Sequence, residues 1–157
     1  MNKSLLNRLV CIFLAASLTA CATSATKPPN PQVVARMHAV DRARMATVVV
    51  YRPREMLGAA LRPTVVLDGK DLLNIGNGKV FVAPIKPGHY TFEMDDKKSG
   101  TQVNLKNGQV VYIKIEIVPG FWKGGGKLTQ VAQEQGEYEA TRLDLIEAKE
   151  IENANFS

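Results

Sequence analysis

The chain has 157 residues, of which 45% are hydrophobic and 22% charged, and its formal charge is +5 at pH 7. This length provides one domain with a short extension. A basic balance can indicate a nucleic-acid partner, but the lysines and arginines are spread along the chain, so we expect no nucleic-acid binding. Both cysteines, Cys11 and Cys21, lie near the N-terminus. We therefore expect no disulfide framework in the domain that follows.

Residues 1–20 have the layout of a secretory signal peptide. Lys3 and Arg8 precede an apolar run at residues 9–18. This run is shorter than the roughly 20 residues that a membrane-spanning helix needs. We therefore predict that the segment is cleaved, and an uncleaved N-terminal anchor is the alternative. Removing the segment takes away Lys3 and Arg8, which leaves a formal charge of +3 (5 − 2).

The segment Leu18-Thr19-Ala20-Cys21 resembles the lipobox of bacterial lipoproteins. In that family the signal is cut just before the cysteine, its thiol receives a diacylglyceryl group, and the new N-terminus is acylated, typically with palmitate. The resemblance implies lipidation at Cys21. In lipoprotein sorting, an aspartate after this cysteine retains the protein in the inner membrane, and this chain has Ala22 there. The resemblance therefore implies a lipid anchor in the cell outer membrane, with the protein on the periplasmic face.

Residues 21–31 are small, polar and rich in proline. Such a composition buries too little apolar surface to offset its ordering entropy, so we predict a lipidated flexible tether. Residues 32–45 follow with apolar positions near helical spacing, including Val33 and Met37. Pro31 is suited to the first turn of a helix. We predict a short helix over residues 32–45.

From residue 46 the chain has the composition of short strands, with β-branched and aromatic residues between turn pairs such as Asp68-Gly69 and Asn107-Gly108. Turn signals that recur about every 8–12 residues are typical of a sandwich or barrel. We predict one β-sandwich domain over residues 46–131. Its expected strands are residues 47–52, 63–67, 71–75, 79–83, 89–94, 101–105, 110–118 and 128–131.

Residues 132–157 are predicted to form a C-terminal helical tail. Turn residues are rare between residues 136 and 153, and charges alternate there in a helical manner. Tyr138, Leu145 and Ala148 fall on one face of such a helix. We therefore expect a helix over most of this tail.

Three segments, residues 49–53, 63–70 and 83–90, are followed by the Asn107-Gly108 turn and a tyrosine-bearing strand at Tyr112. In this order of segments the chain resembles a family of uncharacterised bacterial lipoproteins that share a domain of unknown function. The Asp-Gly strand and the Pro-Gly turn are also similar to PEGA-type domains, which are small β-sandwich surface modules. The resemblance implies an all-β, Greek-key or prealbumin-like β-sandwich of about seven or eight strands, with short N- and C-terminal helices. It implies no activity.

Candidate catalytic groups are sparse, so we expect no enzyme and no cofactor. His38 and His89 are the two histidines, whereas a metal site usually needs three or four ligands, so we expect no metal. Ser99 lacks a nucleophile-elbow motif. The expected role is a non-enzymatic binding or structural module for an envelope protein or peptidoglycan, and an envelope hydrolase or other enzyme with an unrecognised site is the alternative.

The glycine-rich segment at residues 119–127 carries the candidate partner-binding residues Phe121, Trp122 and Lys123. Aromatic side chains in loops suit partner contacts and stacking on sugar rings. The alternative is that Trp122 folds back and seals the core. Arg52 and Arg54 are expected to form a structural ion pair with Asp68.

Overall fold

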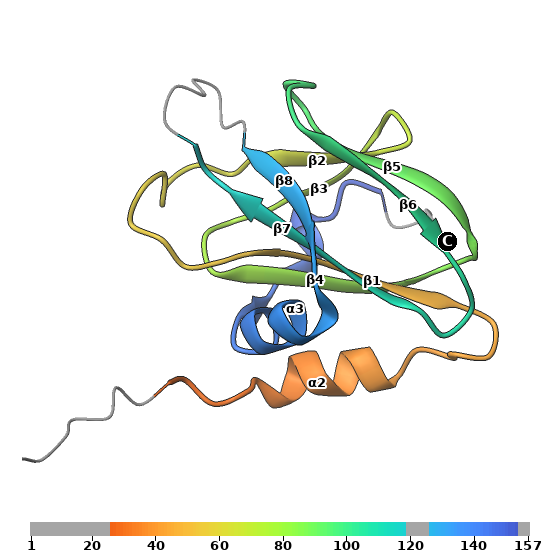
Figure 1. Cartoon of the computed structure of the whole chain (residues 1–157). Helices are drawn as coiled ribbons and strands as arrows, with labels where there is room; N and C mark the ends of the chain where they lie inside the picture. Colours follow the sequence, from red (N-terminus) through yellow and green to blue (C-terminus); the bar gives the residue numbers. More distant parts are fainter. Residues whose placement is uncertain (1–25, 119–125, 154–157) are drawn as a thin grey trace, which may run out of the picture.

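The computed structural model describes residues 26–118 and 126–153, which form two stacked β-sheets with short helices on one of them (Figure 1). Sheet A has the strand order β8-β7-β1-β4-β9, and sheet B has the order β3-β2-β5-β6. In these ranges the elements are α2 (Pro31–His38), β1 (Ala46–Arg52), β2 (Thr64–Leu67), β3 (Lys70–Asn74), β4 (Lys79–Ile85), β5 (Gly88–Met94), β6 (Gly100–Leu105), β7 (Val110–Glu116), β8 (Lys127–Val131), α3 (Gln133–Ala140), β9 (Asp144–Leu145) and η1 (Ala148–Glu150).

Strand β1 is the centre of sheet A. It pairs antiparallel with β4, with Arg52 opposite Lys79, and parallel with β7, with Thr47 opposite Val110. Strand β9 pairs parallel with β4, whereas β8 pairs antiparallel with β7. All pairings in sheet B are antiparallel. Sheet A is therefore mixed, and β1 and β7 end on the same side of the molecule.

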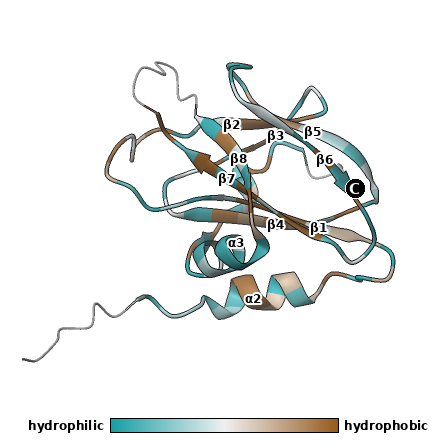
Figure 2. Cartoon of the chain, in the orientation of Figure 1, coloured by the Kyte–Doolittle hydropathy of each residue, from teal (hydrophilic) through white to brown (hydrophobic). Residues whose placement is uncertain are grey.

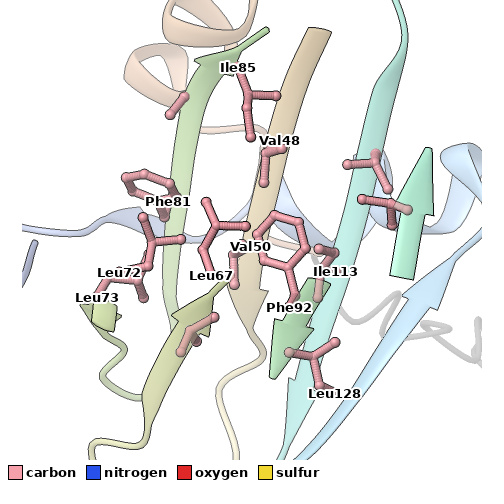
Figure 3. Packing of buried hydrophobic residues seen from close by; sticks show 14 of the residues in the cluster. Val48, Val50, Leu67, Leu72, Leu73, Phe81, Ile85, Phe92, Ile113 and Leu128 are labelled. Carbon is pink, nitrogen blue, oxygen red and sulfur yellow. The ribbon is translucent and has the colours of Figure 1, made fainter. Parts of the chain in front are cut away.

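The main core lies between the two sheets and is made of aliphatic and aromatic side chains (Figure 3). Val48 and Val50 enter it from β1, and Leu67 and Phe92 enter it from sheet B. The second half of β5 alternates in the usual way for a half-buried antiparallel strand, because Phe92 and Met94 are buried while Thr91 and Glu93 are more exposed. Sheet B therefore keeps a polar outer face.

Sheet A is covered on both faces. Helices α2 and α3 pack over its outer face, where a second apolar cluster includes Val33, Val49, Tyr51 and Tyr112 (Figures 1 and 2). For this reason all seven residues of β1 are buried. A Cβ on Gly136 of α3 would lie 2.2 Å from Cγ of Tyr112. The absence of a side chain at this position therefore allows α3 to approach the sheet closely.

The structure confirms the predicted all-β sandwich with short helices, and the eight expected strands all appear with small shifts in their ends. The predicted helix over residues 32–45 is shorter, Pro31–His38, and begins after Asn30, whose side chain accepts a hydrogen bond from Gln32 N. No helix in the described residues is long and apolar enough to cross a membrane.

The predicted helix in the C-terminal tail is wrong beyond residue 140. Helix α3 ends at Ala140, and the chain then forms β9, a ninth strand in the described ranges. The physical reason is the open edge of β4. Asp144 N donates to Gly78 O, and Ile146 N donates to Val80 O. These sheet hydrogen bonds, with Leu143 and Leu145 packed in the second apolar cluster, outweigh the local helical pattern.

Candidate functional site

One end of the sandwich gathers several segments that are distant in sequence. Strand β1 ends there at Arg52, β4 begins there at Lys79, and β9 begins there at Asp144, because these residues are register partners in sheet A. The loop between β1 and β2, residues 53–63, projects from this end, and the chain enters α2 beside it (at the left of Figure 1). We call this region the tether end: residues 26–30, the β1–β2 loop, Lys79 and Asp144.

Arg52 supports the β1–β2 loop from inside the protein. Its side chain is only 1% exposed. Its guanidinium donates to Leu61 O at 2.5 Å and to Gly58 O at 2.6 Å. Burial lowers the pKa of Arg52, partly offset by the charge of Glu55, but an arginine remains protonated in any case. A buried charge is therefore used to hold two loop carbonyls.

The predicted ion pair of Arg52 and Arg54 with Asp68 is wrong. Arg52 binds the loop carbonyls instead, and Arg54 Nη2 lies 3.1 Å from Asp144 Oδ2. Asp68 lies in the turn after β2, and its Oδ1 accepts a hydrogen bond from Thr91 N in sheet B. The prediction failed because closeness in sequence did not place the arginines and Asp68 together in the two-sheet fold.

The β1–β2 loop is also fixed by contacts with its neighbours. Glu55 N donates to Asn77 Oδ1 and Asn77 Nδ2 donates to Glu55 O, each at 2.9 Å. Gly58 has a φ of +67°, and a Cβ there would lie 2.7 Å from Cγ2 of Ile117. Glycine is therefore required at this position by both its backbone conformation and the close approach of Ile117, which follows β7. The loop is an ordered part of the domain.

The apex of this loop is apolar and exposed. Met56 is 98% exposed and Leu57 is 55% exposed. Arg54 and Arg62 flank the apex with largely exposed side chains. A single exposed hydrophobic residue is ordinary on a protein surface. Here two adjacent hydrophobic residues are exposed on a loop that a buried arginine holds in place, and together they form an apolar tip.

Asp144 connects the entering chain to the loop. Lys27 Nζ lies 3.1 Å from Asp144 Oδ1, and Arg54 lies 3.1 Å from Oδ2 of the same carboxylate. The hydrogen bond from Lys27 is the main cause that lowers the pKa of Asp144, and the charges of Lys27, Arg54 and Lys79 lower it further. Asn30 adds a backbone hydrogen bond from its N to Thr141 O, and one from its side chain to Leu143 O. The chain is thus attached to the domain from residue 27 onward.

A second polar cluster lies beneath α3. Tyr51 Oη donates to Glu139 Oε2 at 2.8 Å, and Lys114 Nζ lies 3.2 Å from the same oxygen. Burial is the main cause that raises the pKa of Tyr51, with the hydrogen bond to Glu139 adding to it. Burial would raise the pKa of Glu139, but hydrogen bonds from Gln135, Tyr51 and Lys114 outweigh it and lower this pKa below its ordinary value. These groups are engaged with one another, and they join α3 to strands β1 and β7.

The lipidation residue predicted from the sequence, Cys21, and the predicted partner-binding residues Phe121, Trp122 and Lys123 lie outside the described residues. The assignments at these four positions therefore stay predictions. Strands β7 and β8, which precede and follow residues 119–125, pair antiparallel, and Glu116 at the end of β7 lies opposite Lys127 at the start of β8.

The histidines and Ser99 are not brought together. His38 is exposed at the end of α2, and His89 lines a shallow hollow of about 360 Å³ with Asn104 on sheet B. The hydroxyl of Ser99 accepts from Leu128 N at 2.8 Å and thereby links β8 to sheet B. Within residues 26–118 and 126–153 no group of three or more His, Cys, Asp or Glu side chains is placed to hold a metal ion.

Sequence reasoning missed the Met56–Leu57 tip. A signal was present, because two large apolar residues stand next to Gly58 in a segment between two predicted strands. The contacts by which Arg52 supports the loop could not be predicted from the sequence, because its partners are backbone carbonyls, which every residue has.

Comparison with known proteins identifies the family. A model for the family described as "Protein of unknown function (DUF2846)" matches residues 42–126. The chain belongs to this family. The DUF2846 match begins just before β1 and ends at residue 126, directly before β8, so it includes the β1–β2 loop and excludes α2, α3 and β9. An uncharacterised protein of Haemophilus influenzae is 25% identical over 145 residues, which cover 91% of this chain and 86% of that protein. No solved structure matches.

Proposed function

We propose that this DUF2846 protein is an envelope lipoprotein, anchored in the outer membrane through Cys21, that acts as a non-enzymatic binding module. Its contact surface in this proposal is the tip of the β1–β2 loop. The observation that carries the proposal is the combination at this loop of a nearly fully exposed Met56 with a backbone held by the buried Arg52. A surface that is apolar and ordered before contact loses little conformational freedom when it binds.

The alternative of an envelope hydrolase gains no specific support. The cluster of Tyr51, Glu139 and Lys114 has shifted pKa values, a feature that can mark catalytic sites. However, these side chains bind one another between α3 and sheet A, with Lys114 largely buried. Structural ion-pair networks shift pKa values in the same way, and the geometry here is that of a helix attachment.

Site-specific photo-crosslinking in intact cells tests the proposal. A photoreactive amino acid replaces Met56 in one variant and Asn107 in a control variant. Asn107 is exposed in the turn between β6 and β7, whose Gly108 N bonds Met45 O just before β1 begins, so it lies at the opposite end of β1 from Arg52. We expect an adduct at position 56 and none at position 107.

The anchor is tested in the same cells by fractionation. We expect the wild-type chain in the outer-membrane fraction and the Cys21→Ala variant in the soluble fraction. A Cys21→Ala protein that stays with the membrane overturns the lipid anchor. An absence of adducts at position 56, or equal adducts at positions 56 and 107, overturns the assignment of the loop as the contact surface.

A further inference from the structure

We infer that the tip of the β1–β2 loop contacts the lipid surface itself, so that the domain is held at two points, by the acylated N-terminus and by the side chains of Met56 and Leu57. This inference rests on the proposed function, because it needs the anchor at Cys21. It names the bilayer as the partner of the loop.

The first argument is the length of chain between the anchor and the domain. Five residues lie between Cys21 and Lys27, so six Cα-to-Cα steps join them, and at full extension these steps span about 20 Å. Lys27 is fixed to Asp144 by an ion pair, and Asn30 is bonded to Thr141 and Leu143. The anchored end of the domain therefore stays within about 20 Å of the membrane surface.

The second argument is the position of the loop relative to this attachment. Arg54, at the base of the β1–β2 loop, binds the same carboxylate of Asp144 that holds Lys27. The N-terminal segment at Lys27 and the base of the loop at Arg54 therefore meet at one carboxylate, that of Asp144. In Figure 1 the loop and the start of α2 project from the same end of the molecule. When the tether end faces the bilayer, the loop faces it too.

The third argument is the chemistry of the tip. An apolar apex with cations at its base matches a bilayer interface, where apolar side chains enter the acyl boundary and Lys or Arg side chains meet the phosphates. Met56 and Leu57 form the apex, and Arg54 and Arg62 flank it. Arg54 pairs with Asp144, which also binds Lys27, and Arg62 pairs with Glu150 at 2.5 Å. With Lys79 and Glu55 included, the charged side chains around the loop sum to +1 (4 − 3), so the base of the tip stays weakly positive. Glu55 is the acidic residue of the loop itself, and it is half-buried.

The fourth argument is the strength that the contact needs. Two side chains alone bind a membrane too weakly to localise a protein, and stable attachment usually combines two signals. A lipid anchor supplies the first signal and raises the effective concentration of the loop at the surface. The ordered loop then inserts without first losing conformational freedom. The contact orients an already anchored domain.

Quenching of tryptophan fluorescence by brominated lipids tests this inference. The full chain is produced in cells, and the acylated protein is reconstituted into vesicles of phosphatidylethanolamine and phosphatidylglycerol with brominated acyl chains. The test variant is Met56→Trp in a Trp122→Phe background, which removes the native tryptophan. The matched control is Asn107→Trp in the same background. Both positions are exposed, so neither substitution disturbs the core.

Because residues at the interface lie about 5–10 Å inside the headgroup and acyl boundary, we expect quenching in the Met56→Trp variant to be at least about threefold stronger than in the Asn107→Trp variant. Equal quenching in the two variants overturns the inference. A crosslink from position 56 to a protein, without quenching in the Met56→Trp variant, also overturns it but leaves the proposed function standing. A protein that carries no acyl group in cells overturns both.

Discussion

A methyl group at Gly136 tests the packing of α3 on sheet A. Replacing glycine by alanine inside a helix normally stabilises it by about 1 kcal/mol. Here the new Cβ would lie 2.2 Å from Cγ, 2.3 Å from Cβ and 2.6 Å from Cδ1 of Tyr112. Two of these atoms are the root of the side chain, so a rotation of the Tyr112 ring does not relieve the clash. Helix α3 must therefore move away from β7.

The net effect follows from opposing contributions. Overpacking in a well-packed region costs about 1–3 kcal/mol, and this contact lies at the upper end because the root of Tyr112 cannot yield. Movement of α3 also weakens the hydrogen bond from Tyr51 to Glu139, which is worth about 1.5–3 kcal/mol as a bond to a charged group. After the helix gain of about 1 kcal/mol is subtracted, we expect Gly136→Ala to lower the free energy of unfolding by about 2 kcal/mol if the hydrogen bond is kept and by up to about 5 kcal/mol if it is lost.

Urea denaturation followed by circular dichroism measures this difference. Gln133→Ala is the matched control, because Gln133 is an exposed residue in the first turn of the same helix, and its effect should stay within about 0.5 kcal/mol. A Gly136→Ala protein that is as stable as the wild type, or more stable, would refute the close approach of α3 to Tyr112.

Two further predictions concern the buried polar groups. The lowered pKa of Glu139 means that its interactions stabilise the fold above the ordinary value of 4.5 and are lost as the pH falls through the folded value. The stability deficit of Glu139→Gln at pH 7 should therefore shrink below about pH 4.5, and a deficit that is constant down to about pH 3 would contradict this reasoning. Arg52→Met removes two hydrogen bonds from the β1–β2 loop, so amide exchange at Leu61 should accelerate at least about tenfold, measured by NMR against Ile113 of β7 as the control amide.

The parts of the fold that were predictable are those with a local cause. The strands follow from runs of β-branched and aromatic residues, and the turn at Asp68-Gly69 has the positive φ values, 48° and 78°, that this pair favours. Strand β9 was not predictable, because its partner β4 lies more than 60 residues earlier, from Asp144 back to Lys79. A helical charge pattern is a weak local preference beside the hydrogen bonds of an open strand edge.

The candidate site at the tether end was not predicted from the sequence, because the Met56–Leu57 tip was missed and the arrangement around it depends on the fold. The ion pair between Lys27 and Asp144 joins positions 117 residues apart. No spacing rule connects them, since only the pairing of β9 with β4 brings Asp144 beside Arg54. Arg52 is similar, because a buried arginine that binds backbone carbonyls leaves no complementary acidic residue in the sequence. For Arg52, the sequence predicted the correct strand, residues 47–52, and the wrong partner, Asp68.

The distribution of apolar surface argues for the tether end as the place of contact. Helices α2 and α3 occupy the outer face of sheet A, and the outer face of sheet B presents polar residues such as His89, Gln102 and Asn104. In the part of the chain that the structure describes, the large exposed hydrophobic side chains are Met56, Leu57 and Tyr138.

Tyr138 differs from the loop tip because it is already partly covered. The guanidinium of Arg142 lies 3.8 Å from the centre of its ring, which satisfies the ring face through a cation–π contact. Met56 and Leu57 are the more exposed pair, and their loop is held by Arg52 in the position that exposes them. A flexible loop would bury such side chains against the domain and so remove them from water. A loop with only a structural role has no reason to be held in a position that exposes them, and a contact surface does.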